Sequence, residues 1–406
     1  MTSDQSSPTS SRDRHLFGPG PKRILALDGG GARGILSLAF IERVEAVLAA
    51  RTGRGDAFRL ADYFDLVGGT SIGSILASGV ALRYRVSALI DLFREVCGSV
   101  FRSSWLSFGG LLAPKFSTEA LQAILHRELG DTTLGSDRIA TGLAVVAKRL
   151  DTGSPWILHN NPRGRYFARH SAGGSFIQNK DLLLRRLVQA SAAAPTYFEP
   201  QLIRVADDVD GFFLDGGVSP YNNPALLLMI LATSKGFAFN WKTGERDLFL
   251  VSVGTGAARV RRDAADLDSG PAAFMAIQAL TSLIDDCNIH GQAMLQWMGR
   301  STNPRIIDRE IGDLTDSWPL PGRLLTYTRL DLELQRDVLM RTLGVEVDED
   351  TVSQLRLMDS SSSIDRLLEL GRGAAEKIVN EATLPALFDR GAASGQPDAA
   401  APPAAS

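Results

Sequence analysis

The chain has 406 residues and a formal net charge of −3, with 43 Lys and Arg against 46 Asp and Glu. Because no cationic excess is present to neutralise a phosphate backbone, the composition argues against binding of nucleic-acid duplexes. Cys97 and Cys287 lie far apart and show no zinc-type spacing, which excludes a small disulfide-stapled scaffold. Five histidines are few for an enzyme of this size.

Both ends of the chain are poor in residues that could form a core. Residues 1–20 are rich in Ser and Pro and lack the apolar run of a secretory signal, so we predict a disordered N-terminal lead. Residues 388–406 are rich in Ala and Pro and predict a disordered tail. No apolar stretch approaches the ~18 residues that suggest a membrane span, so we expect a cytoplasmic protein.

Between these ends, over residues 21–387, short apolar runs alternate with helical patterns. The predicted strands, in chain order, are 24–27, 64–67, 143–147, 155–159, 211–214 and 248–253. The predicted helices are 35–49, 118–128, 181–193, 223–232 and 364–381. This alternation is typical of an α/β fold with a mostly parallel central sheet. We predict one large domain, the alternative being that helices after about residue 320 form a separate cap.

A glycine-rich turn, Asp28-Gly29-Gly30-Gly31-Ala32-Arg33-Gly34, follows the first predicted strand and leads into a helix. Such a turn presents consecutive backbone N–H groups that can hold an anion or a developing oxyanion. The spacing from Gly29 to Gly34 also matches a dinucleotide-binding fingerprint, so a nucleotide-binding module is one alternative. That fingerprint expects an acidic residue at the end of the next strand, where this chain has Gly69-Thr70-Ser71.

Ser71 occupies the centre of a G-x-S-x-G motif, between the glycines Gly69 and Gly73. The motif lies after a predicted strand and before a helix of small residues. A Ser on such a sharp turn is exposed at the tip of the helix, and the flanking glycines relieve the crowding. The pattern therefore predicts a nucleophile elbow with Ser71 as the nucleophile.

A nucleophilic Ser needs a base within hydrogen-bonding reach. Asp215 ends a predicted strand and precedes Gly216 and Gly217, so its carboxylate can project from the sheet, although a simple Asp-Gly turn would read the same way. Asp28 has the same Asp-Gly-Gly context, and we assign it to shaping its own turn. The remaining alternative is a Ser-Asp-His triad in which His290 is the base and Asp215 or Asp285 is the carboxylate that orients it. His290 falls in a predicted helix.

Together, the three motifs resemble those of the patatin-like phospholipases. That family carries a D-G-G-G-x-R-G loop, a G-x-S-x-G nucleophile and a D-G-[GA] base in this order, and the chain matches all three. The resemblance covers residues 23–256. Segments between 320 and 385 are similar to C-terminal helical elements of bacterial members.

The resemblance implies a three-layer α/β/α sandwich and a lipid acyl hydrolase of the phospholipase A type. It implies an acyl-enzyme on Ser71 with Asp215 as general base, and neither a metal nor a cofactor. The backbone amides that would form the oxyanion hole are those of Gly29, Gly30 and Gly31. Arg33 would organise this loop or contact the phosphate of the lipid.

The resemblance also raises two expectations about partners. Some bacterial members are antiphage effectors that a cyclic oligonucleotide activates. Two alternatives therefore follow for this chain: a hydrolase that a cyclic nucleotide activates, and one that needs no activator. Residues 100–112 include Trp105 and Phe108 and follow no period. We hypothesise that they form a cap that dips into phospholipid at the inner face of the membrane, the alternative being a loop packed on the core.

Overall fold

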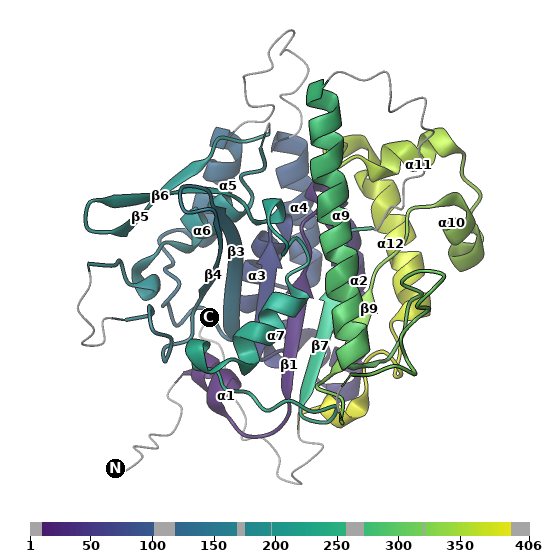
Figure 1. The fold of residues 1–406 in the computed structure, drawn as a ribbon, viewed down its shortest axis with the longest axis horizontal. Coiled ribbons are helices and arrows are strands. Elements are labelled where there is room, and N and C mark those ends of the chain that lie inside the picture. The colour runs from purple at the N-terminus through teal and green to yellow at the C-terminus, as the bar shows by residue number, and fades with distance from the viewer. Residues whose placement is uncertain are drawn as a thin grey trace.

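The computed structural model describes residues 10–100, 118–168, 175–195, 197–256, 272–319 and 321–390 (Figure 1). Its strands are β1 (Lys22–Leu27), β2 (Leu66–Thr70), β3 (Gly142–Arg149), β4 (Ser154–His159), β5 (Gln201–Ala206), β6 (Val209–Asp215), β7 (Leu248–Val253), β8 (Arg300–Ser301) and β9 (Thr326–Leu330). Its helices are α1 (Ser11–Phe17), α2 (Gly34–Thr52), α3 (Ile72–Ala81), α4 (Val86–Val100), α5 (Thr118–Leu129), α6 (Leu184–Ser191), α7 (Ala225–Thr233), α9 (Ala272–Met298), α10 (Arg336–Leu343), α11 (Glu349–Arg356) and α12 (Ile364–Ile378).

The described strands form one mixed sheet with a parallel centre. Strands β3, β2, β1, β7, β9 and β8 lie side by side in this order and run parallel to one another. Strand β4 pairs antiparallel with the outer edge of β3, and β6, which pairs with β5, lies antiparallel along the last residues of β3. The mostly parallel sheet between helical layers confirms the predicted three-layer α/β/α sandwich. Every predicted strand is present, with the second shifted to Leu66–Thr70.

Strand β1 shows why both faces of the sheet are covered. Leu25 and Leu27 belong to a core shared with α2, α3, α4 and α12. Ile24 and Ala26 point the opposite way, into a second core with α7 and Leu295 of α9. Alternate side chains of a strand point to opposite faces, so a continuous apolar run needs a helical layer on each side. In Figure 1, α7 and α9 lie in front of the sheet and α2 and α3 behind it.

The predicted disorder of residues 1–20 is wrong for its second half, which contains α1. Ser10 caps this helix by accepting a hydrogen bond from the N–H of Asp13. His15 is buried, and its Nδ1 lies 3.0 Å from Oδ1 of Asp65. The Nζ of Lys22 donates to the carbonyl oxygen of His15 at 2.6 Å. Asp65 lies 50 residues along the chain from His15, so the local polarity of the segment did not reveal this contact.

The predicted disorder of the tail is wrong for Phe388, Asp389 and Arg390. Phe388 is fully buried and stacks on Phe249 of β7, with ring centroids 4.8 Å apart. Asp389 forms an ion pair with Arg51 at 2.5 Å. Arg390 donates to Oδ1 of Asp65. One aromatic ring and two charges are enough to hold this end on the core, although its composition resembles a disordered segment.

Candidate active site

Ser71 lies on a strained turn between β2 and α3. Its backbone has φ 55° and ψ −129°, a region that non-glycine residues rarely adopt. A Cβ on Gly69 would overlap the backbone of Gly73, and a Cβ on Gly73 would overlap the carbonyl oxygen of Leu27. Only glycine at both positions lets strand and helix approach this closely. The turn therefore has the geometry of the predicted nucleophile elbow.

Two serines hold the elbow from below. The N–H of Ser71 donates to Oγ of Ser191 at 2.9 Å, and Oγ of Ser191 donates to the carbonyl oxygen of Val146 at 2.6 Å. Ser74 donates its hydroxyl to the carbonyl oxygen of Ser71 at 2.7 Å. Ser191 ends α6 within a run of small residues, and no motif in the sequence assigned it a contact with Ser71. Hydrogen bonds from α6 and α3 thus stabilise the strained backbone conformation of Ser71.

The pairing of β3 brings Asp215 beside Ser71. Strand β4 occupies one edge of β3, so β2 and β6 share the other edge. Thr70 at the end of β2 pairs with Val146, and the next residue of β3, Ala147, pairs with Asp215 at the end of β6. Because β2 and β6 run in opposite directions, their carboxyl ends meet on this edge.

The hydroxyl of Ser71 donates to Oδ2 of Asp215 at 2.6 Å. The other carboxylate oxygen, Oδ1, accepts a hydrogen bond from the N–H of Gly217 at 2.6 Å, which fixes the orientation of the carboxylate. Burial raises the pKa of Asp215 to about 6, although the hydrogen bonds from Ser71 and Gly217 favour its ionised form. The pair has the geometry of a nucleophile and its general base.

The predicted oxyanion loop lies beside Ser71, but its three glycines are not equivalent. The N–H of Gly29 donates to the carbonyl oxygen of Asn222 at 3.0 Å, so this amide is not available to an oxyanion, contrary to the expectation from the sequence. The N–H groups of Gly30 and Gly31 form no hydrogen bond within the described parts of the chain. Gly31 has φ 58°, which turns the backbone back toward α2.

Arg33 follows this loop and faces the same cavity. Its Nη1 donates to the carbonyl oxygen of Gly256 at 3.1 Å. Its Nε is buried and makes no hydrogen bond to any described residue. Arg33 therefore connects the end of the loop to the segment after β7 and keeps one donor without a partner among the described residues.

A cavity of about 500 Å³ opens above Ser71 and Asp215. One part of its lining is charged and consists of Asp28, Arg33, Asp285, Arg305, Arg329, Asp331 and Glu333. Another part is apolar and includes Pro195, Val218, Leu280, Ile284, Ile289, Ile306, Ile307 and Met358. Helix α9 supplies Leu280, Ile284 and Ile289. Such a lining suits a ligand with an apolar chain and a charged group.

The alternative bases are placed elsewhere. Asp28 points its Oδ2 at Arg329, at 2.6 Å. His290 is exposed on α9 and is absent from the cavity lining, whereas Asp285 and Ile289 face the cavity. At 100° per residue, His290 lies about 140° around the helix from Asp285. The structure therefore does not assemble the Ser-Asp-His triad. The hypothetical cap at residues 100–112 falls almost entirely outside the described residues.

A sequence model of the patatin-like phospholipase family matches residues 25–229, half of the chain. The chain belongs to the patatin-like phospholipase family. This membership confirms the resemblance of the three motifs. Helices in the described ranges are all too short or too polar to cross a membrane.

Three curated relatives share 29% identity with this chain. A cGAMP-activated phospholipase of Escherichia coli (strain TW11681) aligns over 236 residues, or 57% of this chain and 62% of the relative. A cGAMP-activated phospholipase of Vibrio cholerae aligns over 214 residues, or 50% and 56%. Patatin-17 of Solanum cardiophyllum aligns over 245 residues, or 57% and 60%. The chain thus spans 56–62% of the length of these relatives.

Proposed function

We propose that this patatin-like protein hydrolyses carboxylic esters of glycerophospholipids with Ser71 as nucleophile and Asp215 as general base. The observation that carries the proposal is the 2.6 Å hydrogen bond from Ser71 to Asp215 at the floor of a partly apolar cavity. Its apolar wall suits an acyl chain, and the unused Nε of Arg33 suits a phosphate oxygen.

In the proposed mechanism, Asp215 takes the hydroxyl proton while Oγ of Ser71 attacks the ester carbonyl carbon. The amides of Gly30 and Gly31 stabilise the negative charge that develops on the carbonyl oxygen. Collapse of this intermediate breaks the bond to the alcohol, and Asp215 returns the proton to the departing lysophospholipid oxygen. A water molecule, deprotonated by Asp215, then attacks the carbonyl carbon of the acyl-enzyme. The bond to Oγ of Ser71 breaks, Asp215 returns the proton to this oxygen, and a fatty acid leaves.

We further propose that a cyclic dinucleotide switches on this activity. The support is the name of two relatives, cGAMP-activated phospholipase, at 29% identity. Contact with the membrane would then be peripheral, at its cytoplasmic face. The weak net charge favours contact through apolar side chains at the cavity mouth over long-range attraction to anionic lipids.

A nucleotide-binding module that uses the loop from Gly29 to Gly34 is the weaker alternative. Three groups of this loop already have partners in the protein: the N–H and the carbonyl of Gly29, and the N–H of Ala32, which donates to the carbonyl oxygen of Met358. A phosphate at this loop would therefore meet fewer amides than in a phosphate-binding turn.

The test incubates the purified full chain with vesicles of mixed phospholipids, with and without cGAMP, and identifies the products by mass spectrometry. We expect lysophospholipid and fatty acid from the unmodified protein and none from Ser71→Ala. Products that require cGAMP support the activator, and equal yields without it argue against one. Two results would contradict the proposed function. One is that Ser71→Ala still hydrolyses the phospholipids; the other is that the unmodified protein hydrolyses none of them, with or without cGAMP.

A further inference from the structure

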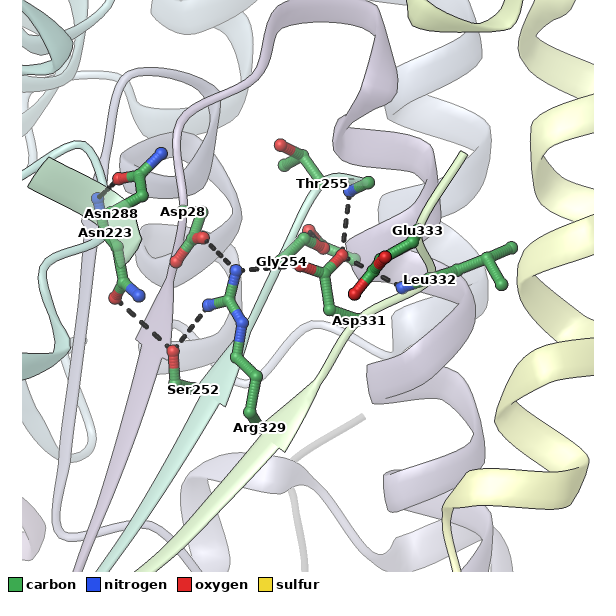
Figure 2. Close-up of polar contacts among 12 residues, drawn as sticks. Asp28, Asn223, Ser252, Gly254, Thr255, Asn288, Arg329, Asp331, Leu332 and Glu333 are labelled. Carbon is green, nitrogen blue, oxygen red and sulfur yellow. Dashed lines mark hydrogen bonds and ion pairs between the residues drawn. The ribbon is translucent and has the colours of Figure 1, made fainter. Parts of the chain in front are cut away.

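Arg329 lies on β9, outside the part of the chain that matches the family model, yet it contacts the first residue of the oxyanion loop. It is buried, with 4% of its surface exposed. Its Nη2 donates to Oδ2 of Asp28 at 2.6 Å and to Oδ2 of Asp331 at 2.9 Å, and its Nη1 donates to Oγ of Ser252 at 2.7 Å. Figure 2 shows the guanidinium between these three partners.

Asp28 has a single side-chain partner among the described residues. Its carboxylate is buried, and Oδ1 has no hydrogen bond, so the contact with Arg329 alone orients the group. Its backbone N–H donates to the carbonyl oxygen of Val253 at 3.1 Å. Asp28 directly precedes Gly29, so its contact with Arg329 holds the chain at the point where the loop leaves β1.

Asp331, the second carboxylate on Arg329, holds the segment on the other side of the loop. Its Oδ1 accepts hydrogen bonds from the N–H groups of Gly256 at 2.9 Å and Leu332 at 3.0 Å. The carbonyl of the same Gly256 accepts the hydrogen bond from Arg33. Through Asp28 and Asp331, one guanidinium is thus connected to both the start and the end of the oxyanion loop.

Thr255, next to Gly256, completes this support. Its hydroxyl donates to the carbonyl oxygen of Gly29 at 2.9 Å. A Cβ on Gly30 would overlap the side chain of Thr255, so the segment after β7 packs directly against the loop. A shift of this segment would therefore also displace the backbone of Gly30.

A buried ion-pair cluster of this kind is weak evidence for a contribution to the stability of the fold. Replacing a buried ion pair by apolar groups of similar size is often neutral, whereas removal of one partner alone is strongly destabilising. A planar guanidinium that contacts two carboxylates and a hydroxyl is instead a rigid spacer, which Lys cannot reproduce with its single nitrogen. The cluster is therefore better explained by the geometry it imposes on its neighbours.

We propose that Arg329 is a positioning residue for the oxyanion loop, acting through Asp28 and Asp331 to hold the amides of Gly30 and Gly31 against the carbonyl that Ser71 attacks. This inference rests on the proposed ester hydrolysis. Donors that contact the oxyanion act mainly in the transition state, so their misplacement lowers kcat and leaves KM nearly unchanged. Loss of one such donor lowers kcat about 10²–10³-fold.

The test compares Arg329→Lys, which keeps the charge, with the double variant Asp28→Asn/Arg329→Met, which removes the charge of Asp28 together with that of Arg329 and leaves Arg305, 4.0 Å away, as the remaining cation at Asp331. Arg323→Met is the matched control, because Arg323 lies in the same region and donates to the carbonyls of Gly299 and Thr315, away from the cavity. Each variant is assayed for kcat and KM on a soluble short-chain ester. Hydrogen exchange of residues 28–35 and thermal unfolding are measured in parallel.

We expect kcat to fall about 10²-fold in the double variant and about tenfold in Arg329→Lys, with KM within about twofold and faster exchange confined to the loop. The control should match the unmodified protein in kcat, KM and loop exchange. Unchanged kcat or unchanged loop exchange in a folded variant would overturn the proposal, as would faster exchange spread over the whole chain. If the unmodified protein hydrolyses no ester, the proposed function fails, and loop exchange still decides the positioning role.

Discussion

Asp215→Asn removes the proposed base and leaves its surroundings almost unchanged. The amide oxygen can still accept the hydrogen bond from Gly217 that the carboxylate accepts at 2.6 Å, but it cannot take the proton of Ser71. General-base catalysis contributes about 10²–10⁴-fold, so kcat should fall by that factor, or by about 3–5 kcal/mol at 1.36 kcal/mol per tenfold. The free energy of unfolding should not fall in Asp215→Asn, because burial already disfavours the charged form of Asp215.

The pH dependence of the unmodified protein tests the same assignment. A general base must be ionised, and the pKa of Asp215 is raised to about 6. The value of kcat/KM should therefore be flat above pH 7 and fall as the pH drops through about 6, to about one tenth at pH 5. An unshifted carboxylate would retain almost full activity at that pH.

The assay measures kcat/KM on a soluble ester between pH 4.5 and 8.5, with circular dichroism at each pH to follow the folded state. A soluble ester removes any effect of pH on vesicle binding. The reasoning is refuted if Asp215→Asn keeps more than a tenth of the activity while folded. It is also refuted if the unmodified protein remains fully active at pH 5.

Three further predictions concern residues around the site and the core. His290→Ala should leave kcat within about twofold of the unmodified protein, because His290 is exposed and outside the cavity lining. Loss of activity in this variant would instead support the Ser-Asp-His triad. Leu283 and Ile306 are apolar and 58% and 67% exposed. Replacing both by Ser should reduce the rate of vesicle hydrolysis about tenfold or more and leave the rate on a soluble ester unchanged. Equal loss on both substrates would exclude a lipid-contacting role. Asp65→Asn should lower the free energy of unfolding by about 3–5 kcal/mol, since it leaves Arg23 and Arg390 without their buried carboxylate, and denaturant titration should show this. Although burial opposes ionisation, His15, Arg390 and Arg23 lower the pKa of Asp65 to about 2, so this stabilisation should be present above about pH 4 and lost as the pH falls through 2.

The sequence alone determined the fold class, the family and the local geometry of the turns. Apolar runs of four to six residues predicted the strands, because a strand buried on both faces must be apolar throughout. The glycines around Ser71 predicted the elbow, because a side chain at Gly69 or Gly73 would overlap backbone. These features depend on residues close together in the chain, so a motif can encode them.

Only the tertiary structure decided which distant groups meet. Asp28, Asp215 and Asp285 were all candidates in the sequence, and the pairing of β2 and β6 on one edge of β3 brings Asp215 into contact with Ser71. The use of the Gly29 amide by Asn222 was equally invisible in the sequence. So was the contact of Arg329 with Asp28, 301 residues apart. Such contacts depend on strand order and on which buried charges need partners, and neither is encoded in a local pattern.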